Sequence, residues 1–101
     1  MTDLPKLVRD EVPRIARENG DDPTVHVADD AEYGRRLRAK LVEEATEFAE
    51  SGALDALADV LEVVRAIRAY RDVDAAELAA LRAAKADERG GFAERYVLDA
   101  V

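Results

Sequence analysis

The 101-residue chain contains no cysteine and no tryptophan, and it has only two phenylalanines, three tyrosines and one histidine. Without cysteine it can form neither a disulfide framework nor a thiolate zinc site. Because large aromatic side chains are scarce, the core must consist of Ala, Leu and Val, which suit closely packed helices. Apolar residues make up 49% of the chain, enough for a core. We therefore expect residues 1–101 to form one small domain.

Long apolar segments and an excess of positive charge are also absent. No apolar run approaches the roughly 20 residues that span a membrane, and the first residues do not resemble a secretory signal, so we expect a cytoplasmic protein. The chain has 23 acidic and 15 basic residues, which gives a formal net charge of −8. This balance disfavours binding to a nucleic-acid polymer. It suits solubility, or a small phosphorylated ligand held through metal ions.

Four segments have the pattern of helices, and we expect an all-α fold. Their expected ranges are 10–19, 30–50, 53–70 and 74–90. Only Ser51 and Gly52 separate the second segment from the third, so these two must fold back as an antiparallel helical hairpin. Residues 24–27 could form a short strand that pairs with residues 96–98. Pairing of two hairpins would complete a four-helix bundle.

Acidic residues lie beside the apolar face of both hairpin helices. At 100° per residue, Glu44 projects from the middle of the apolar stripe of the second helix, and Glu43 and Glu47 border it. That stripe consists of Leu37, Leu41, Ala45 and Phe48. On the third helix, one line contains Asp55, Asp59 and Glu62. The short loop therefore brings two acidic ridges together.

Burying like charges costs several kcal/mol unless something compensates. Arginine or lysine partners, protonation of some acids, or divalent cations between the helices would each do so. Oxygen ligands without cysteine favour Mg²⁺ or Mn²⁺ over zinc. The alternative is that these acids simply face water, and Asp55 in particular could complement the dipole at the start of its helix.

The spacing of the acids also matches a known motif. "EEATE" at 43–47 has the form E-E-x-x-E, and "LADVLE" at 57–62 follows after a short turn. This pattern resembles the all-α nucleotide pyrophosphohydrolases, the MazG-like and phosphoribosyl-ATP pyrophosphohydrolase-like family, whose signature continues with E-x-x-D. The flanking segments "KLVRDEVPRI" and "KADERGGF" resemble a small subgroup of that family. One position departs from the signature: Ala56 stands where the glutamate of its E-x-x-D part is expected. Asp55 or Glu62 could replace that ligand, and Glu62 is the better candidate because apolar residues flank it.

The resemblance implies a hydrolase that uses Mg²⁺, or Mn²⁺, to cleave a nucleoside triphosphate or related nucleotide to the monophosphate and pyrophosphate, a house-cleaning activity. The implied metal ligands are Glu43, Glu44, Glu47 and Asp59, with Glu62 as the substitute. Glu44 or Glu47 would also be the catalytic base, and the residues alone do not choose between them. Substrate phosphates need cationic contacts. The candidates are Lys6, Arg9, Lys85 and Arg89, each of which could instead be a solvated surface charge.

The third helix is apolar over more than half its circumference, so we expect a homodimer or a higher homo-oligomer. Two other functions compete with hydrolysis. Ala56 would suit a nucleotide- or metal-binding module with little turnover. A purely structural helical bundle is the other possibility, but Glu44 on the apolar stripe argues against it. The sequence does not identify the base of the nucleotide.

Overall fold

The computed structural model describes residues 4–101, and this part of the chain contains four α-helices and no strand. The helices are α1 (Val12–Glu18), α2 (Asp30–Ser51), α3 (Leu54–Tyr70) and α4 (Ala75–Arg89). Each begins and ends within one helical turn of the position expected from the sequence. The predicted all-α fold is therefore confirmed.

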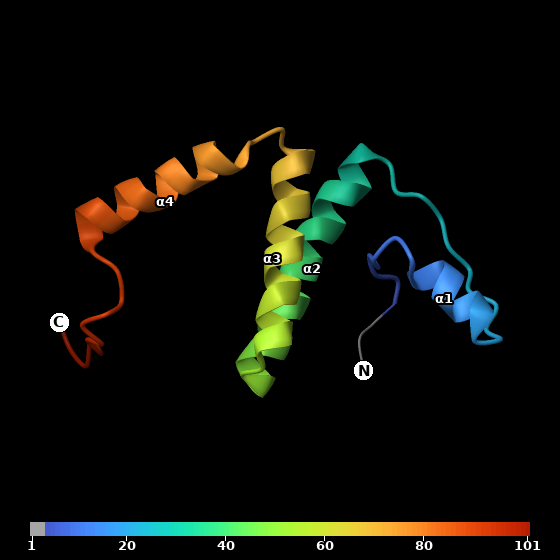
Figure 1. Cartoon of the computed structure of the whole chain (residues 1–101), viewed down its shortest axis with the longest axis horizontal. Coiled ribbons are helices and arrows are strands. Elements are labelled where there is room, and N and C mark those ends of the chain that lie inside the picture. Colours follow the sequence, from blue (N-terminus) through green and yellow to red (C-terminus); the bar gives the residue numbers. More distant parts are fainter. Residues whose placement is uncertain (1–3) are drawn as a thin grey trace.

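Helices α2 and α3 lie side by side as an antiparallel hairpin at the centre of the molecule (Figure 1). The reversal occurs at Gly52, whose φ of 64° is in the left-handed region that favours glycine. Its N–H donates to the carbonyl oxygen of Phe48 over 2.7 Å, which closes the last turn of α2. The predicted hairpin is confirmed, and it forms the frame on which the acidic residues sit.

At the open end of the hairpin, Tyr70 packs across α2. Its ring stands edge-on to Tyr33, with ring centroids 5.5 Å apart, and its hydroxyl donates to the carbonyl oxygen of Asp30. This ring position requires Gly34, because a Cβ there would lie 2.5 Å from the tyrosine Oη. The glycine inside α2 thus allows the last residue of α3 to close the hairpin.

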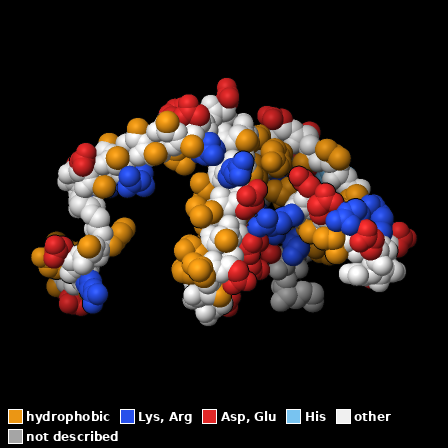
Figure 2. All heavy atoms as spheres, viewed as in Figure 1, with side chains coloured by type: hydrophobic (Ala, Val, Ile, Leu, Met, Phe, Trp, Pro, Cys, Tyr) orange, Lys and Arg blue, Asp and Glu red, His pale blue; other side chains and the backbone are white. Residues whose placement is uncertain are grey.

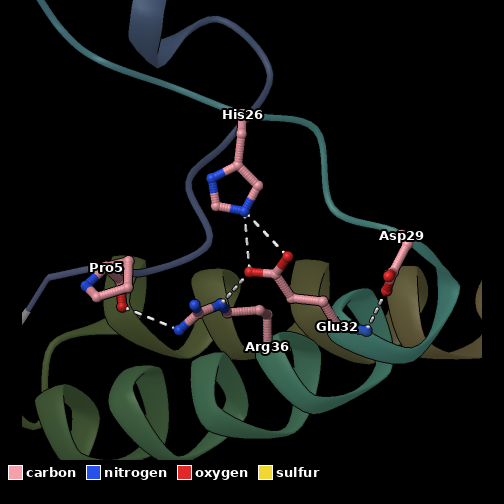
Figure 3. Close-up of polar contacts among 5 residues, drawn as sticks. All are labelled: Pro5, His26, Asp29, Glu32 and Arg36. Atoms are coloured by element: carbon pink, nitrogen blue, oxygen red, sulfur yellow. Dashed lines mark hydrogen bonds and ion pairs between the residues drawn. The ribbon is translucent and has the colours of Figure 1, made fainter.

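The segment before α2 is attached to that helix through Glu32 (Figure 3). Asp29 caps the helix by accepting a 2.8 Å hydrogen bond from the Glu32 N–H. The Glu32 carboxylate does not accept a hydrogen bond from the Asp29 backbone N–H, as it would in a capping box. It lies 3.0 Å from His26 Nε2 and accepts a 3.0 Å hydrogen bond from Arg36 Nε, and these two contacts lower the pKa of Glu32. Arg36 also donates to the carbonyl oxygen of Pro5, so one network joins the N-terminal segment, the loop and α2.

The chain buries few apolar side chains. Among residues 4–101, only Leu37 and Val63 are buried hydrophobic residues. The radius of gyration is 17.3 Å, whereas a compact domain of this length has about 13 Å. The accessible surface is 8796 Å², against about 5,700 Å² for a compact monomer of this mass. Helix α4 explains part of the difference, because it extends away from the hairpin as a separate arm (Figure 1).

One sequence expectation needs correction. The proposed strand pairing is wrong: residues 24–27 and 96–98 contain no strand, and they lie on opposite sides of the molecule (Figure 1). Residues 24–27 instead follow an irregular path held by His26. A single chain provides a two-helix hairpin, as expected, since α1 and α4 do not pack extensively on it. No helix in residues 4–101 is long and apolar enough to cross a membrane.

Candidate functional site

Three glutamates of α2 converge on one side of the hairpin. Glu43, Glu44 and Glu47 each present a carboxylate oxygen, and these oxygens lie within 4.8 Å of one another. Glu47 lies four residues after Glu43 and three after Glu44, and these spacings bring side chains together on a helix. The three residues, called the glutamate cluster below, differ in burial: Glu44 is buried, Glu43 is partly buried and Glu47 is exposed.

The carboxylate of Glu44 is only half satisfied. The residue is 8% exposed, and its Oε1 lies 3.3 Å from the ammonium of Lys40. Its Oε2 is fully buried, and no hydrogen-bond donor from residues 4–101 reaches it. A buried acceptor without a partner is costly, so such atoms are rare in native proteins. The oxygen is therefore a candidate ligand atom for a bound cation.

Glu47 lies against Glu44 at the exposed edge of the cluster. The adjacent Glu44 carboxyl group raises the pKa of Glu47, first because a protonated Glu47 can donate a hydrogen bond to it and then through charge repulsion. Within residues 4–101, no basic side chain forms an ion pair with Glu47. Two carboxyl groups can share a hydrogen bond only when one is protonated. The pair is therefore suited to take up a positive charge, from a proton or from a cation.

Lys40 is the residue of this site that the sequence interpretation missed. Its ammonium lies 3.2 Å from Glu43 and 3.3 Å from Glu44, and its side chain is 15% exposed. Partial burial lowers the pKa of Lys40, but the hydrogen bonds to the two glutamates outweigh that effect and raise it overall. The i, i+3 and i, i+4 spacing in "KLVEE" was the available signal. Lysine thus compensates part of the cluster's negative charge.

Asp59 and Glu62 of α3 border the same pocket as Glu44. The pocket has a volume of about 400 Å³ and lies between the N-terminal segment, α2 and α3. Asp59 is not in the glutamate cluster; its Oδ1 accepts a 2.7 Å hydrogen bond from Arg9 Nη2. Glu62 is exposed at the pocket wall. The hairpin therefore brings the five predicted ligands to one side of the molecule, with the α3 pair separate from the three glutamates.

The four cations proposed from the sequence divide into two pairs. Lys6 lies 3.6 Å from Glu43, and Arg9 binds Asp59, so both contact the acidic residues. Figure 2 shows basic and acidic side chains gathered between the hairpin and α1. Lys85 and Arg89 lie in the C-terminal half of α4, the part of the arm farthest from the hairpin (Figure 1). Within one chain they do not reach the pocket.

Comparison with known proteins gives limited guidance. No protein-family model and no solved structure matches the chain. A stretch of 53 residues is 38% identical to an uncharacterised protein of Mycolicibacterium smegmatis, covering 52% of this chain. The chain thus spans about half the length of this curated relative (54%). The relative's description names no activity, so the functional argument depends on the residues of this chain.

Proposed function

We propose that this protein is a nucleotide pyrophosphohydrolase of the MazG-like type, which cleaves a nucleoside triphosphate or related nucleotide to the monophosphate and pyrophosphate. The observation that carries the proposal is the glutamate cluster, in which the buried Oε2 of Glu44 has no donor within residues 4–101. The E-E-x-x-E spacing at 43–47 supplies the family resemblance. A cytoplasmic location, expected from the sequence, belongs to the same proposal.

The side chains present are suited to a hard divalent cation. All the candidate ligands are carboxylate oxygens, the ligand type that Mg²⁺ and Mn²⁺ prefer. A cation bound by Glu43, Glu44 and Glu47 would give the buried Oε2 of Glu44 a partner and would relieve the repulsion between Glu44 and Glu47. Asp59 and Glu62 border the same pocket and could contribute further ligands. In this proposal, Glu62 replaces the glutamate that the signature expects at Ala56.

Cleavage of a phosphoric anhydride needs charge neutralisation and a correctly placed water molecule more than covalent chemistry. When bound, the cation would supply both, by holding phosphate oxygens and activating water. Glu47 is the better candidate for the base that orients that water, because its side chain is exposed whereas Glu44 is buried. Arg9 borders the pocket and Lys6 reaches the cluster, so both are positioned to contact an anionic substrate.

A binding module with little turnover is the second candidate. Two observations favour it: Ala56 replaces a ligand of the family signature, and Arg9 already holds Asp59. Both functions require the cation, so metal binding alone does not distinguish them. Release of pyrophosphate does.

The test is a pyrophosphate-release assay with a panel of nucleoside triphosphates, with and without Mg²⁺. We expect Mg²⁺-dependent turnover that Glu47→Gln and Asp59→Asn abolish. Glu50→Gln is the matched control, because Glu50 is an exposed glutamate on the same helix, one turn after the cluster. Nucleotide binding without turnover would favour the binding module. If neither binding nor turnover occurred with any nucleotide of the panel, the proposal would be wrong.

Assembly into a homodimer or higher oligomer is part of the proposed function. The accessible surface exceeds that of a compact monomer by about 3,100 Å² a chain. Obligate homodimers bury about 2,000–5,000 Å² in total, so the excess is enough for one. The outer face of α3 exposes Leu54, Leu57 and Leu61, at 81%, 40% and 66%. A second hairpin packed on this face would complete the four-helix bundle.

A further inference from the structure

Residues 4–11, which precede α1, lie along the acidic side of the hairpin, and we call them the N-terminal strap. Two of its cations contact the acids: Lys6 lies 3.6 Å from Glu43, and Arg9 lies 2.7 Å from Asp59. Leu7 and Val8 form part of the wall of the 400 Å³ pocket. The strap therefore forms part of the pocket wall and pairs with one acid of each hairpin helix.

We propose that the strap is an exchangeable cover, whose Arg9 and Lys6 occupy the acidic residues until a divalent cation enters and then bind the phosphates of the anionic ligand. This inference rests on the proposed function, since it requires that the acids bind a divalent cation. It adds a regulatory step: the ion pairs that hold the strap compete with the metal, and their release prepares the phosphate site.

Competition follows from the atoms involved. Arg9 binds Oδ1 of Asp59, and Lys6 approaches Oε2 of Glu43, so each cation contacts a carboxylate that the metal would need. The Arg9 and Asp59 side chains are 59% and 41% exposed, and ion pairs that open to solvent are weak and readily exchanged. A divalent cation brings more charge to the same carboxylate oxygens and can therefore displace the Arg9 and Lys6 side chains.

The released arginine is well placed for its second role. Arg9, Lys40 and Glu44 border the same pocket, so the guanidinium need not leave the site to meet a ligand there. Arginine binds phosphate oxygens through two parallel N–H donors. Lys40 cannot perform this exchange equally well, because it is bound to two glutamates of its own helix and its side chain is 15% exposed.

The strap has a second attachment that would keep it near the site after exchange. Arg36 Nη1 of α2 donates a 3.1 Å hydrogen bond to the carbonyl oxygen of Pro5 (Figure 3). Arg36 is itself held by Glu32 through a 3.0 Å hydrogen bond. These contacts use no acid of the candidate metal site. Metal entry would therefore free the Arg9 end while the Pro5 end stays attached.

The test is a pair of calorimetric titrations on the full chain, first with Mn²⁺ and then with inorganic pyrophosphate at saturating Mn²⁺. We expect Arg9→Gln to bind Mn²⁺ about two- to fivefold more tightly than the wild type, the range that loss of a competing exposed ion pair yields. The same variant should bind pyrophosphate about tenfold more weakly, because a charge-assisted hydrogen bond is lost. A merely structural arginine would shift both affinities in the same direction.

Arg17→Gln is the matched control, since Arg17 is an exposed arginine of α1 that does not line the pocket. It should match the wild type in both titrations. If Mn²⁺ binds the wild type but binds Arg9→Gln equally or more weakly, the strap inference is overturned while the cation site stands. If Mn²⁺ binds neither protein, the cation site itself is wrong, and the strap inference fails with it.

Discussion

Replacement of Glu44 by leucine tests whether this buried carboxylate serves the fold or a ligand. In the metal-free protein its Oε2 is buried without a donor, and its Oε1 has Lys40 as an ion-pair partner. Lys40 keeps a second partner, Glu43, when Glu44 is removed. We therefore expect Glu44→Leu to make the metal-free protein more stable, the opposite of the usual effect of a substitution at a buried position.

The size of the effect follows from the contacts. An unsatisfied buried polar group costs about 1–3 kcal/mol, and the remaining Glu43 partner of Lys40 avoids the penalty of an unpaired buried charge. A gain of about 1–3 kcal/mol is therefore expected for Glu44→Leu. For a chain of this size each kcal/mol raises the Tm by roughly 4–8 °C. In the wild type, Mg²⁺ at one hundred times its Kd should contribute about 2.7 kcal/mol, and the variant should lose that contribution.

The assay is thermal unfolding at one fixed protein concentration, in EDTA and in millimolar Mg²⁺. The expected result is a crossover: the variant melts above the wild type in EDTA and gains nothing from Mg²⁺. Glu50→Leu, at an exposed position of the same helix, should stay within about 0.5 kcal/mol of the wild type in EDTA and keep the Mg²⁺ effect. A Glu44→Leu variant that is less stable in EDTA would show that the Lys40 ion pair holds the hairpin, and the ligand argument would fail.

Three further substitutions test other parts of the structure. Replacing glycine by alanine inside a helix usually raises the free energy of unfolding by about 1 kcal/mol, but Gly34→Ala should not, because the new Cβ would meet Tyr70. The same substitution should give that gain in a Tyr70→Ala background. Denaturant titrations that show equal effects in both backgrounds would contradict the packing of Tyr70 on Gly34. Leu61→Glu should leave a species near 11.1 kDa in light scattering where the wild type has at least twice that mass, and a wild-type mass near 11.1 kDa would remove the case for assembly. Contacts with His26 and then Arg36 lower the pKa of Glu32, so its stabilising effect is present above its ordinary pKa of 4.5 and is lost as the pH falls through the lowered value. Glu32→Gln should thus lower the Tm near neutral pH and not well below pH 4.5, and a Tm difference independent of pH would refute this.

The sequence was sufficient for the helices and for the hairpin because the relevant signals are local. Asp29 and Asp74 cap α2 and α4 through the N–H groups of Glu32 and Glu77, as their three-residue spacing predicts. The reversal at Gly52 likewise depends on one residue. The convergence of three glutamates on α2 follows from helical periodicity alone. These features need no knowledge of how distant segments meet.

Which groups compensate the charge of the acidic residues depends on contacts between distant segments, and the sequence pattern does not specify these contacts. Helical periodicity left three explanations open: lysine and arginine partners, protonation, and metal ions. The structure pairs Asp59 with Arg9, fifty residues earlier in the chain, and Lys40 with Glu43 and Glu44. It also leaves one oxygen of Glu44 without a donor in residues 4–101. Ion pairs therefore compensate part of the negative charge of the acidic site. The unpartnered oxygen of Glu44 is the observation that favours a cation there.

The position of α4 shows why the sequence could not assign Lys85 and Arg89 to the site. The direction of this helix is set by the turn after α3, where Asp72 adopts a φ of 54° although it is not glycine. The amphipathic pattern of α4 identifies a helix but not the surface on which it packs. Its exposed apolar residues include Leu78 and Leu81, which border a second groove against α3. Because α4 extends away from the hairpin, a contact of Lys85 and Arg89 with an acidic pocket would require another copy of the chain, and the light-scattering measurement therefore also tests a role for these two residues.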